Sequence, residues 1–160
     1  MDLKIVKVDY SNIKHRVDLS FLLNEYAKDP MGGGRALDKG LLNSLSDRLM
    51  DFPGAISFLA YLGDQAVGLA NCFMGFSTFK AQPLINIHDF TILKKYRGKG
   101  ISSHLFKQIE RYALEKDCCK ITLEVLNKNH VAMKAYQKFG FSAYELDPNA
   151  GQAIFLEKQI

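Results

Sequence analysis

Cysteine is scarce in this 160-residue chain, and no stretch of it stays apolar for long. The three cysteines, Cys72, Cys118 and Cys119, are odd in number and include an adjacent pair, which suits no disulfide framework and favours a reducing compartment. No apolar run reaches the roughly 20 residues that a membrane-spanning helix needs. The first ten residues alternate charged with apolar side chains, unlike the apolar segment of a signal peptide. We therefore expect a cytoplasmic protein with no membrane partner.

A large excess of charge of one sign is also missing. Lys and Arg number 21 and Asp and Glu 17, so the formal net charge is +4. No basic stripe with interleaved aromatic residues is present, which argues against a nucleic-acid partner. Repeats, low-complexity tracts and linkers are absent as well, and 48% apolar with 24% charged residues is typical of a globular protein. We expect a single domain over residues 1–160.

The chain does contain a regular series of apolar patterns. Their spacing predicts a strand, two helices, three strands, a helix, a strand, a helix and two strands. The expected strands are residues 3–9, 55–62, 66–76, 84–93, 121–126, 141–146 and 153–156. The expected helices are residues 17–27, 37–50, 101–113 and 131–139. This order predicts an α/β (α+β) fold, a mixed sheet flanked by helices in which residues 84–126 form a βαβ crossover.

Basic residues gather around two glycines where the fourth expected strand gives way to a helix. Four of the 21 lysines and arginines lie within residues 94–99, namely Lys94, Lys95, Arg97 and Lys99. A helix N-terminus has unpaired backbone N–H groups and a dipole that favours anions, and Gly98 and Gly100 allow the backbone to approach a ligand closely. The spacing matches neither the P-loop nor the dinucleotide fingerprint, whose third glycine would stand at Ser103. The stretch predicts a site for a small anionic ligand, with an exposed basic loop as the alternative.

Two segments resemble the motifs of one enzyme superfamily. Residues 97–102, Arg-Gly-Lys-Gly-Ile-Ser, resemble the Arg/Gln-x-x-Gly-x-Gly/Ala signature of the GNAT acyltransferases, with Ser102 in place of the usual Gly or Ala. Residues 129–141 resemble the Asn-x-x-Ala-x-x-x-Tyr-x-x-x-Gly-Phe segment of the same superfamily. The resemblance covers about residues 84–142 and implies the GNAT fold, a mostly antiparallel central sheet of about six to seven strands with about four helices.

This resemblance implies that acetyl-CoA is the cosubstrate and that no metal takes part. The glycine turn would bind the pyrophosphate, the strand before it would pair with the pantetheine arm, and the helix of the second motif would contact that arm. The implied cofactor-binding residues are Phe90, Thr91, Ile92, Arg97, Gly98, Lys99, Gly100, Ile101, Ser102, Ser103, Asn129 and Ala132. Asn129 also suits a second role, because an Asn before a helix caps its N-terminus.

Acetyl transfer to an amine needs positioning of the two reactants, a proton acceptor for the ammonium and a proton for the departing thiolate. The resemblance places the hydroxyl of Tyr136 near the CoA sulfur, as the proton donor. The helical spacing of Tyr136 with Ala132, Ala135 and Phe139 would equally suit a residue of the core.

Three residues are candidates for the proton acceptor. His88 could serve because an imidazole has an unperturbed pKa of about 6.5, and Asp89 and Glu124 are the acidic candidates on this strand and the next. Adjacent strand residues point to opposite faces, so we expect His88 and Asp89 to have separate roles, with Asp89 holding the cationic amine. A buried, hydrogen-bonded polar group is the alternative for each.

The resulting hypothesis is an acetyl-CoA-dependent N-acetyltransferase. It would move the acetyl group to a primary amine of a small molecule or peptide by direct attack in a ternary complex. The two N-terminal helices, the glycine loop at residues 31–34 and the strand segment at residues 73–76 would form the acceptor pocket, with Glu25 and Asp29 at the border of the loop. A non-catalytic acyl-CoA-binding or regulatory module is the alternative, and a homodimer is among the assemblies that the resemblance allows.

Overall fold

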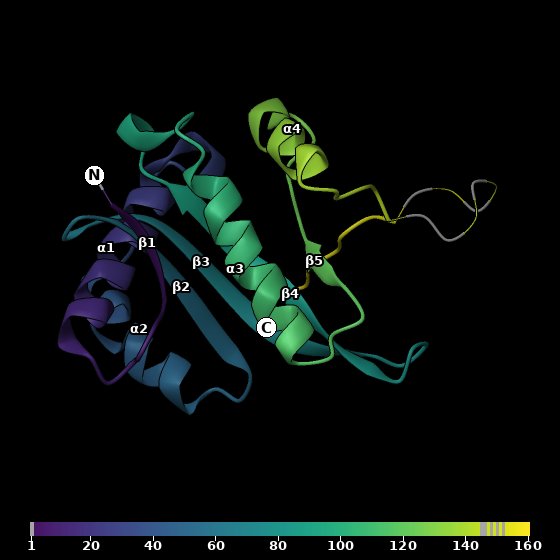
Figure 1. Cartoon of the computed structure of the whole chain (residues 1–160), viewed down its shortest axis with the longest axis horizontal. Coiled ribbons are helices and arrows are strands. Elements are labelled where there is room, and N and C mark those ends of the chain that lie inside the picture. The colour runs from purple at the N-terminus through teal and green to yellow at the C-terminus, as the bar shows by residue number, and fades with distance from the viewer. Residues whose placement is uncertain (1, 145–146, 148, 150, 152) are drawn as a thin grey trace. The chain divides into compact units, whose positions relative to one another are not determined.

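The computed structural model describes residues 2–144, 147, 149, 151 and 153–160. The chain divides into two compact units, Met1–Leu126 and Asn127–Ile160. In chain order the first unit holds β1 (Leu3–Lys7), α1 (Ile13–Lys28), the 3-10 turn η1 (Pro30–Gly32), α2 (Lys39–Asp51), β2 (Ala55–Leu62), β3 (Gln65–Ser77), β4 (Gln82–Ile92), the 3-10 turn η2 (Lys94–Tyr96), α3 (Ile101–Glu115) and β5 (Ile121–Leu123) (Figure 1). The second unit holds α4 (His130–Lys138). The single domain over residues 1–160 stays a prediction.

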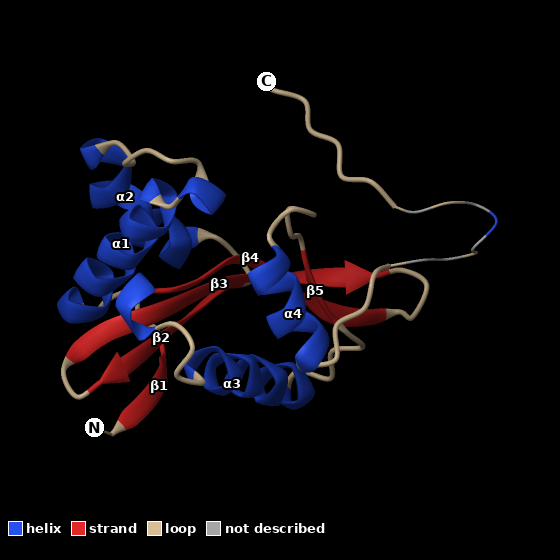
Figure 2. Cartoon of the chain, turned by 90° about the horizontal axis from the view of Figure 1, so that it is seen from above, coloured by secondary structure: helices blue, strands red, loops and turns tan. Residues whose placement is uncertain are grey.

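The strands of the first unit form one sheet in the order β1-β2-β3-β4-β5. Neighbouring strands are antiparallel except β4 and β5, which are parallel. Because α3 connects that parallel pair, β4, α3 and β5 form a βαβ crossover, as the sequence pattern predicts. Seen from above, the sheet lies between α1 and α2 on one side and α3 on the other (Figure 2). A mixed, mostly antiparallel sheet flanked by helices is therefore confirmed.

Each face of the sheet is buried under helices, with alternate strand residues contributing to each side. On the side of α1 and α2, the directly paired Leu59 and Leu69 pack with Leu19 and Leu22 of α1 in a fully buried cluster. Of the residues whose helical spacing predicts α1, Leu22 lies in this cluster, whereas Val17 and Phe21 are 62% and 47% exposed. Burial of side chains of this size contributes about 2 kcal/mol each, so this layer fixes α1 on the sheet.

Aromatic pairs join α3 to the opposite face of the sheet. Phe58 of β2 meets Tyr112 edge to face, with ring centroids 5.9 Å apart. Phe90 of β4 stacks on Phe106, with centroids 4.2 Å apart and ring planes 4° from parallel. These contacts hold α3 across β2 and β4, and they fix where its first turn lies relative to the end of β4.

The number of strands is lower than predicted. Five strands occur in the described residues rather than six to seven, and residues 141–144 and 153–156 are irregular. Residues 145 and 146, at the end of the expected sixth strand, lie outside the described residues. The side chains of Ile154, Phe155 and Leu156 are 71–79% exposed. The sequence pattern measures only how well a segment would fit a sheet, whereas a strand also needs a partner in register.

The first helix begins earlier than its apolar spacing predicts, and its N-terminal cap explains the difference. α1 begins at Ile13 rather than at residue 17, because the side chain of Asn12 accepts a hydrogen bond from the N–H of His15 at 3.2 Å. Ile13 is 79% exposed, so the buried face alone does not mark this first turn. At 16 residues α1 is still too short and polar for a bilayer, and no helix in the described part of the chain is long and apolar enough to cross one.

Candidate functional site

The glycine turn lies between the end of β4 and the first residue of α3. Gly98 and Gly100 have φ of 76° and 78°, in the left-handed region that glycine adopts without strain. Gly100 is the N-cap residue of α3 and supplies no capping side chain. In the described ranges, the backbone N–H groups of residues 98–102 have no hydrogen-bond acceptor. Several amide donors are therefore free at a helix N-terminus, which is the arrangement that binds phosphate groups.

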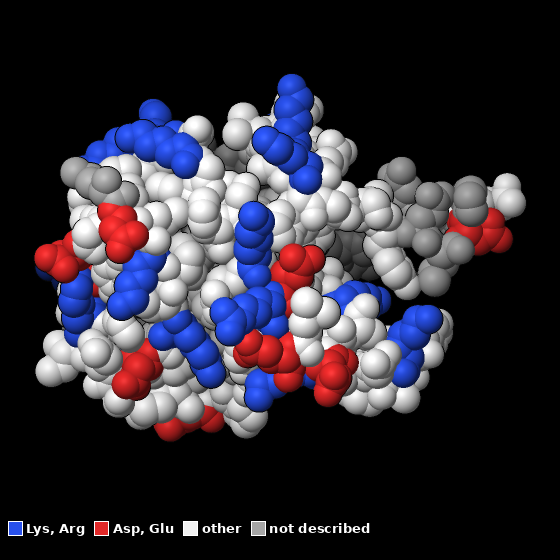
Figure 3. Space-filling model, viewed as in Figure 1, with Lys and Arg blue, Asp and Glu red and all other residues white. Residues whose placement is uncertain are grey.

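Two lysines at the turn place their ammonium groups near one aromatic ring. The Nζ atoms of Lys95 and Lys99 lie 4.9 Å and 5.2 Å from the centre of the Tyr96 ring. The hydroxyl of Tyr96 donates a hydrogen bond to the side-chain oxygen of Gln65 at 2.6 Å. A group of basic side chains is visible at the upper left of Figure 3, where Figure 1 shows the turn that precedes α3. The turn therefore combines free amides with nearby positive charge.

Arg97 stabilises the turn through side-chain bonds to two residues outside it. Its Nε donates to the carbonyl oxygen of Ile92 at 2.9 Å, and a terminal guanidinium nitrogen lies 2.8 Å from a carboxylate oxygen of Asp29. Asp29 is also the N-cap residue of η1 and accepts a hydrogen bond from the N–H of Met31. The bond from Met31 and then the Arg97 guanidinium lower the pKa of Asp29 below its ordinary value. Arg97 thus ties the end of β4 to the loop that follows α1.

This ion pair predicts a pH-dependent contribution to stability. Because the pKa of Asp29 is lowered in the folded state, the stabilisation is fully present above the ordinary carboxyl pKa and is lost as pH falls through the lowered one. The Arg97 side chain is 45% exposed, so the contribution is about 1 kcal/mol or less. Asp29→Asn, which keeps an acceptor for Met31, should lower the urea-unfolding free energy at pH 7 and lower it less at pH 3. Equal losses at both pH values would contradict the pairing.

β5 lies beside β4 over only part of its length. The parallel ladder pairs residues from Ile85 with Ile121 to Ile87 with Leu123, and β4 then continues to Ile92 without β5 beside it. The side chains of Thr91 and Ile92 are buried, so only their backbone could meet a ligand. The side chain of Ile101 is also buried, at 3% exposed, so only its backbone could meet a ligand. β4 thus has no β5 residue paired beside it at the end that leads to the glycine turn.

A β-bulge in β4 places His88 and Asp89 on the same face. Asn71 pairs with Asp89 while Cys72 pairs with Ile87, so His88 is the extra residue. The ring of His88 lies 5.7 Å from that of Phe73, and the Asp89 carboxylate accepts a hydrogen bond from Asn71 at 2.9 Å. Asn71 and Phe73 are two apart on β3 and share one face. The expectation that His88 and Asp89 point to opposite faces is therefore wrong, because the bulge interrupts the alternation.

A buried chain of hydrogen bonds leads away from Asp89. Asn71 donates to Asp89 and accepts from the hydroxyl of Ser57 at 2.6 Å, and Ser57 lies 2.9 Å from the hydroxyl of Tyr10. Ser57 and Asn71 are 1% and 3% exposed. Leaving one partner of such a pair unsatisfied costs about 1–3 kcal/mol, so the chain holds the Asp89 carboxylate in one orientation.

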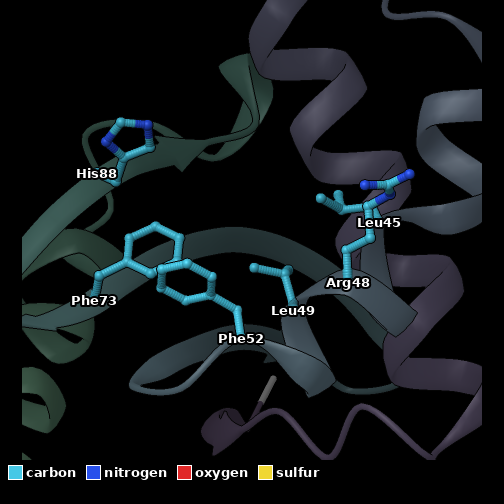
Figure 4. Close-up of a pocket in the computed structure, with 6 residues that line it drawn as sticks. All are labelled: Leu45, Arg48, Leu49, Phe52, Phe73 and His88. Carbon is cyan, nitrogen blue, oxygen red and sulfur yellow. The ribbon is translucent and has the colours of Figure 1, made fainter.

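The bulge also borders a pocket of about 310 Å³. Its lining comes from α2, the residue after it, β3 and the bulge itself: Leu45, Arg48, Leu49, Phe52, Phe73 and His88 (Figure 4). Phe52 meets Phe73 edge to face with ring centroids 5.5 Å apart. The sequence predicts a pocket from the N-terminal helices and residues 73–76, and α2 and Phe73 do line this one. Glu124, the third candidate base, is exposed and lies directly after β5, not on the strand.

The second motif is built around the two ends of α4, in the other compact unit. The side chain of Asn129 accepts the N–H of Ala132 at 3.2 Å, so Asn129 is the N-cap of α4. At the other end Gly140 has a φ of 102°, and the N–H of Phe141 reaches the carbonyl oxygen of Tyr136 at 3.0 Å. The rings of Phe141 and Tyr136 lie 6.0 Å apart. This is a Schellman ending with its apolar contact, which explains the spacing of Tyr, Gly and Phe in the segment.

Residues 20–141, or 122 of 160, match the model of the acetyltransferase (GNAT) family. The chain belongs to this family. It is 35% identical over 78 residues to thialysine N-epsilon-acetyltransferase of Bos taurus, covering 49% of this chain and 45% of that protein. It is 34% identical over 86 residues to N-alpha-acetyltransferase 30 of Xenopus laevis, covering 54% and 31%. The chain thus spans about half or less of the length of these curated relatives. The superfamily predicted from the two motifs is confirmed.

The fold of this GNAT chain is shared with solved structures. An aminoglycoside acetyltransferase from an uncultured soil metagenomic sample, in complex with sisomicin, superposes with a TM-score of 0.79 over 99% of this chain and 96% of that one. At 16% identity the likeness concerns the fold alone. Among the described residues, no group of three or more His, Cys, Asp or Glu side chains is placed to hold a metal ion.

Sequence reasoning missed several residues that shape the site of this GNAT chain. Asn71 and Ser57 orient Asp89, and each is a polar residue within an otherwise apolar buried strand, which is a signal that could have identified them. Arg48 and Phe52 line the pocket, and nothing in the local sequence of α2 distinguishes them. Their role depends on how α2 packs against β3, which is a tertiary property.

Cys72 lies at the bulge, but its thiol is a buried core group and is not suited to nucleophilic catalysis. Burial, and then the charge of Asp89, raises the pKa of the Cys72 thiol to about 12, and the side chain is 1% exposed. A thiol that stays protonated and shielded is a poor nucleophile. We expect an aromatic disulfide reagent at pH 8 to modify Cys118 and Cys119 in the native protein, and Cys72 only after unfolding in urea. A third thiol reacting at the native rate of the others would contradict this, and Cys72→Ala supplies the reference count.

Proposed function

We propose that this GNAT chain transfers the acetyl group of acetyl-CoA to a primary amine of a small molecule or a peptide. The observation that carries the proposal is the glycine turn, where the free amides of residues 98–102 stand at the N-terminus of α3. Family membership supports acetyl-CoA as the anionic ligand of this turn. Relatives named for acetylation of thialysine and of N-terminal amines support amines as acceptors.

The turn and the end of β4 would hold the cofactor. Backbone amides of residues 98–102, with Lys99 beside them, would bind the pyrophosphate. The backbone of residues 90–92, beyond the β5 ladder, would pair with the pantetheine arm, as the resemblance implies. Arg97 would act through its bonds to Ile92 and Asp29, which fix the shape of the turn.

The reaction is a direct attack in a ternary complex. The neutral amine nitrogen attacks the thioester carbonyl carbon, the C–N bond forms, and the C–S bond breaks as CoA leaves. The departing thiolate takes a proton, which we assign to the Tyr136 hydroxyl from its place in the second motif. The nitrogen loses one proton as the amide forms, and a proton returned through solvent restores the Tyr136 hydroxyl. The protein holds the amine and the thioester next to each other, which converts a bimolecular reaction into an effectively unimolecular step.

His88 and Asp89 serve the acceptor on one face of β4. The Asp89 carboxylate, held by Asn71, attracts the ammonium form of the amine. His88 is exposed at the rim of the pocket and takes the proton from that ammonium, directly or through one water molecule. Glu124 is the alternative proton acceptor, because it is exposed and directly follows Leu123, the partner of Ile87 in the ladder between β4 and β5.

Calorimetric titration with acetyl-CoA, followed by an amine panel monitored through released thiol, tests the proposal. We expect saturable binding and acetylation of at least one primary amine. No binding at millimolar acetyl-CoA would overturn the cofactor assignment, and salt-dependent DNA binding in its place would indicate a nucleic-acid function. Binding without turnover on any amine would support the non-catalytic acyl-CoA-binding module. The cytoplasmic location and the homodimer stay predictions.

A further inference from the structure

The pocket beside the bulge has an almost wholly apolar surface, and one cationic side chain, Arg48, is among the residues that line it. Leu45, Arg48, Leu49 and Phe52 follow one another at positions i, i+3, i+4 and i+7, so they share one face at the end of α2. Phe73 lies between Phe52 and His88, with ring centroids 5.5 Å and 5.7 Å away. The pocket is thus lined by aliphatic and aromatic groups from α2 to the bulge.

We propose that this pocket binds the apolar body of the acceptor, and that Arg48 selects acceptors that carry a carboxylate at the end remote from the amine. The proposal rests on the proposed function, since it names the substrate class of the same site. A pocket of about 310 Å³ lies at the lower end of the roughly 300–1,000 Å³ that ligand sites occupy, which suits a small acceptor body such as one aromatic ring with a short chain.

The guanidinium of Arg48 is available for a ligand. In the part of the chain that the structure describes, no carboxylate forms an ion pair with it. The neighbouring Asp47 is already engaged, at 2.7 Å, by Arg16. An arginine presents a planar fork of donors that matches a carboxylate in two parallel hydrogen bonds. Arg48 therefore supplies an unused, geometrically specific partner for an anionic group.

The two polar side chains of the pocket stand at separate places along its lining. In Figure 4 the imidazole of His88 lies over the ring of Phe73, and the guanidinium of Arg48 lies beyond Leu49, beside Leu45. Asp89 lies next to His88 on the same face of β4. A ligand with an amine at one end, a ring in the middle and a carboxylate at the other end complements this order of charges.

The same charges disfavour polycationic acceptors. None of the six described residues that line the pocket is acidic, and Asp89 at its edge offers one carboxylate for one ammonium. A second ammonium in the pocket would lie near Arg48 without a counter-charge, and specificity often depends on such repulsion. Arg48 also stands in the last turn of α2, where a cation is favourable to the helix dipole. A test must therefore separate ligand binding from helix stability.

Acceptors that differ only in their charged end distinguish an effect on ligand binding from an effect on helix stability. We expect 4-(2-aminoethyl)benzoate to be acetylated with a KM roughly tenfold or more below that of 4-(2-aminoethyl)benzamide, and 1,4-bis(aminomethyl)benzene to be the poorest of the three. Arg48→Gln should abolish the preference, so that the benzoate and the benzamide are acetylated with the same KM. Arg48→Lys keeps the helix-end charge but loses the fork, so it should retain only part of the preference. Arg111→Gln, which alters an exposed pair with Glu115 on α3, is the control and should change nothing.

A binding measurement distinguishes failure of this proposal from failure of the transferase assignment. 4-Ethylbenzoate has no amine, and we expect the wild-type protein, but not Arg48→Gln, to bind it in calorimetry in the presence of CoA. That result without acetylation of any probe would keep the pocket assignment and overturn the proposed function. Acetylation with equal KM for the benzoate and the benzamide, or preference for the diamine, would overturn the pocket assignment and keep the transferase.

Discussion

Replacing Gly100 with valine is expected to weaken acetyl-CoA binding roughly ten- to a hundredfold, because valine at a left-handed position costs about 1–3 kcal/mol. Gly100 has a φ of 78° and caps α3, and a Cβ there would meet no protein atom within 4 Å. The backbone would relieve the strain by leaving the left-handed region, which turns the free amides of residues 98–102 away from a common centre. Calorimetric titration with acetyl-CoA measures the loss directly.

Two further variants separate the causes of that loss. Gly63 in the turn between β2 and β3 has a φ of 60° and equally open space, so Gly63→Val imposes similar strain outside the cofactor turn and should leave the acetyl-CoA Kd unchanged. Asn tolerates the left-handed region, so Gly100→Asn should keep the turn intact while its side chain stands near the amides. We expect an intermediate loss for it. Wild-type affinity in both Gly100 variants would show that the turn does not hold the phosphates.

The glycine turn illustrates which features the sequence alone can predict. Its conformation follows from local chemistry, since Gly98 and Gly100 adopt the left-handed φ that few other residues adopt without strain. The apolar stripe that predicts α3 likewise corresponds to its buried face, which includes Ile101, Leu105 and Ile109. Asn129 suits two roles from its sequence, and one of them, the capping bond to Ala132, is local enough to be predicted. Features that a few neighbouring residues determine are therefore accessible from the sequence.

The bulge at His88 shows why the rest could not be predicted. Strand alternation is a local rule, but the bulge exists because β3 and β4 change register between Asn71 and Cys72. That change of register depends on pairing between residues about 20 positions apart in the sequence. It also places Asp89 on the same face of β4 as His88, where strict alternation would place it on the opposite face. The pocket has the same origin, because Phe52 meets Phe73 only when α2 has packed against β3. Long-range register and packing therefore decide the acceptor side of the site, whereas local chemistry decides the cofactor side.

Tyr136→Phe should lower kcat for acetyl transfer by roughly a hundredfold or more, which is the usual size of a general acid effect. The substitution removes only the hydroxyl, so the ring keeps its contact with Phe141, 6.0 Å away, and the backbone bond that ends α4 remains. Acetyl-CoA affinity and thermal stability should therefore stay close to wild type. Steady-state kinetics with the best amine of the panel, and calorimetry with acetyl-CoA, measure the two quantities separately.

The matched control for this variant is Tyr112→Phe. Tyr112 lies on α3, where its ring packs edge to face against Phe58, and its hydroxyl should be dispensable for transfer. If Tyr136 donates the proton, the deficit of Tyr136→Phe should shrink for a CoA analogue whose thiol has a lower pKa, because a better leaving group needs less protonation. A purely structural tyrosine would give the same deficit with both cosubstrates. Unchanged turnover in Tyr136→Phe would assign the tyrosine to the apolar face of α4 and leave the thiolate to be protonated by solvent.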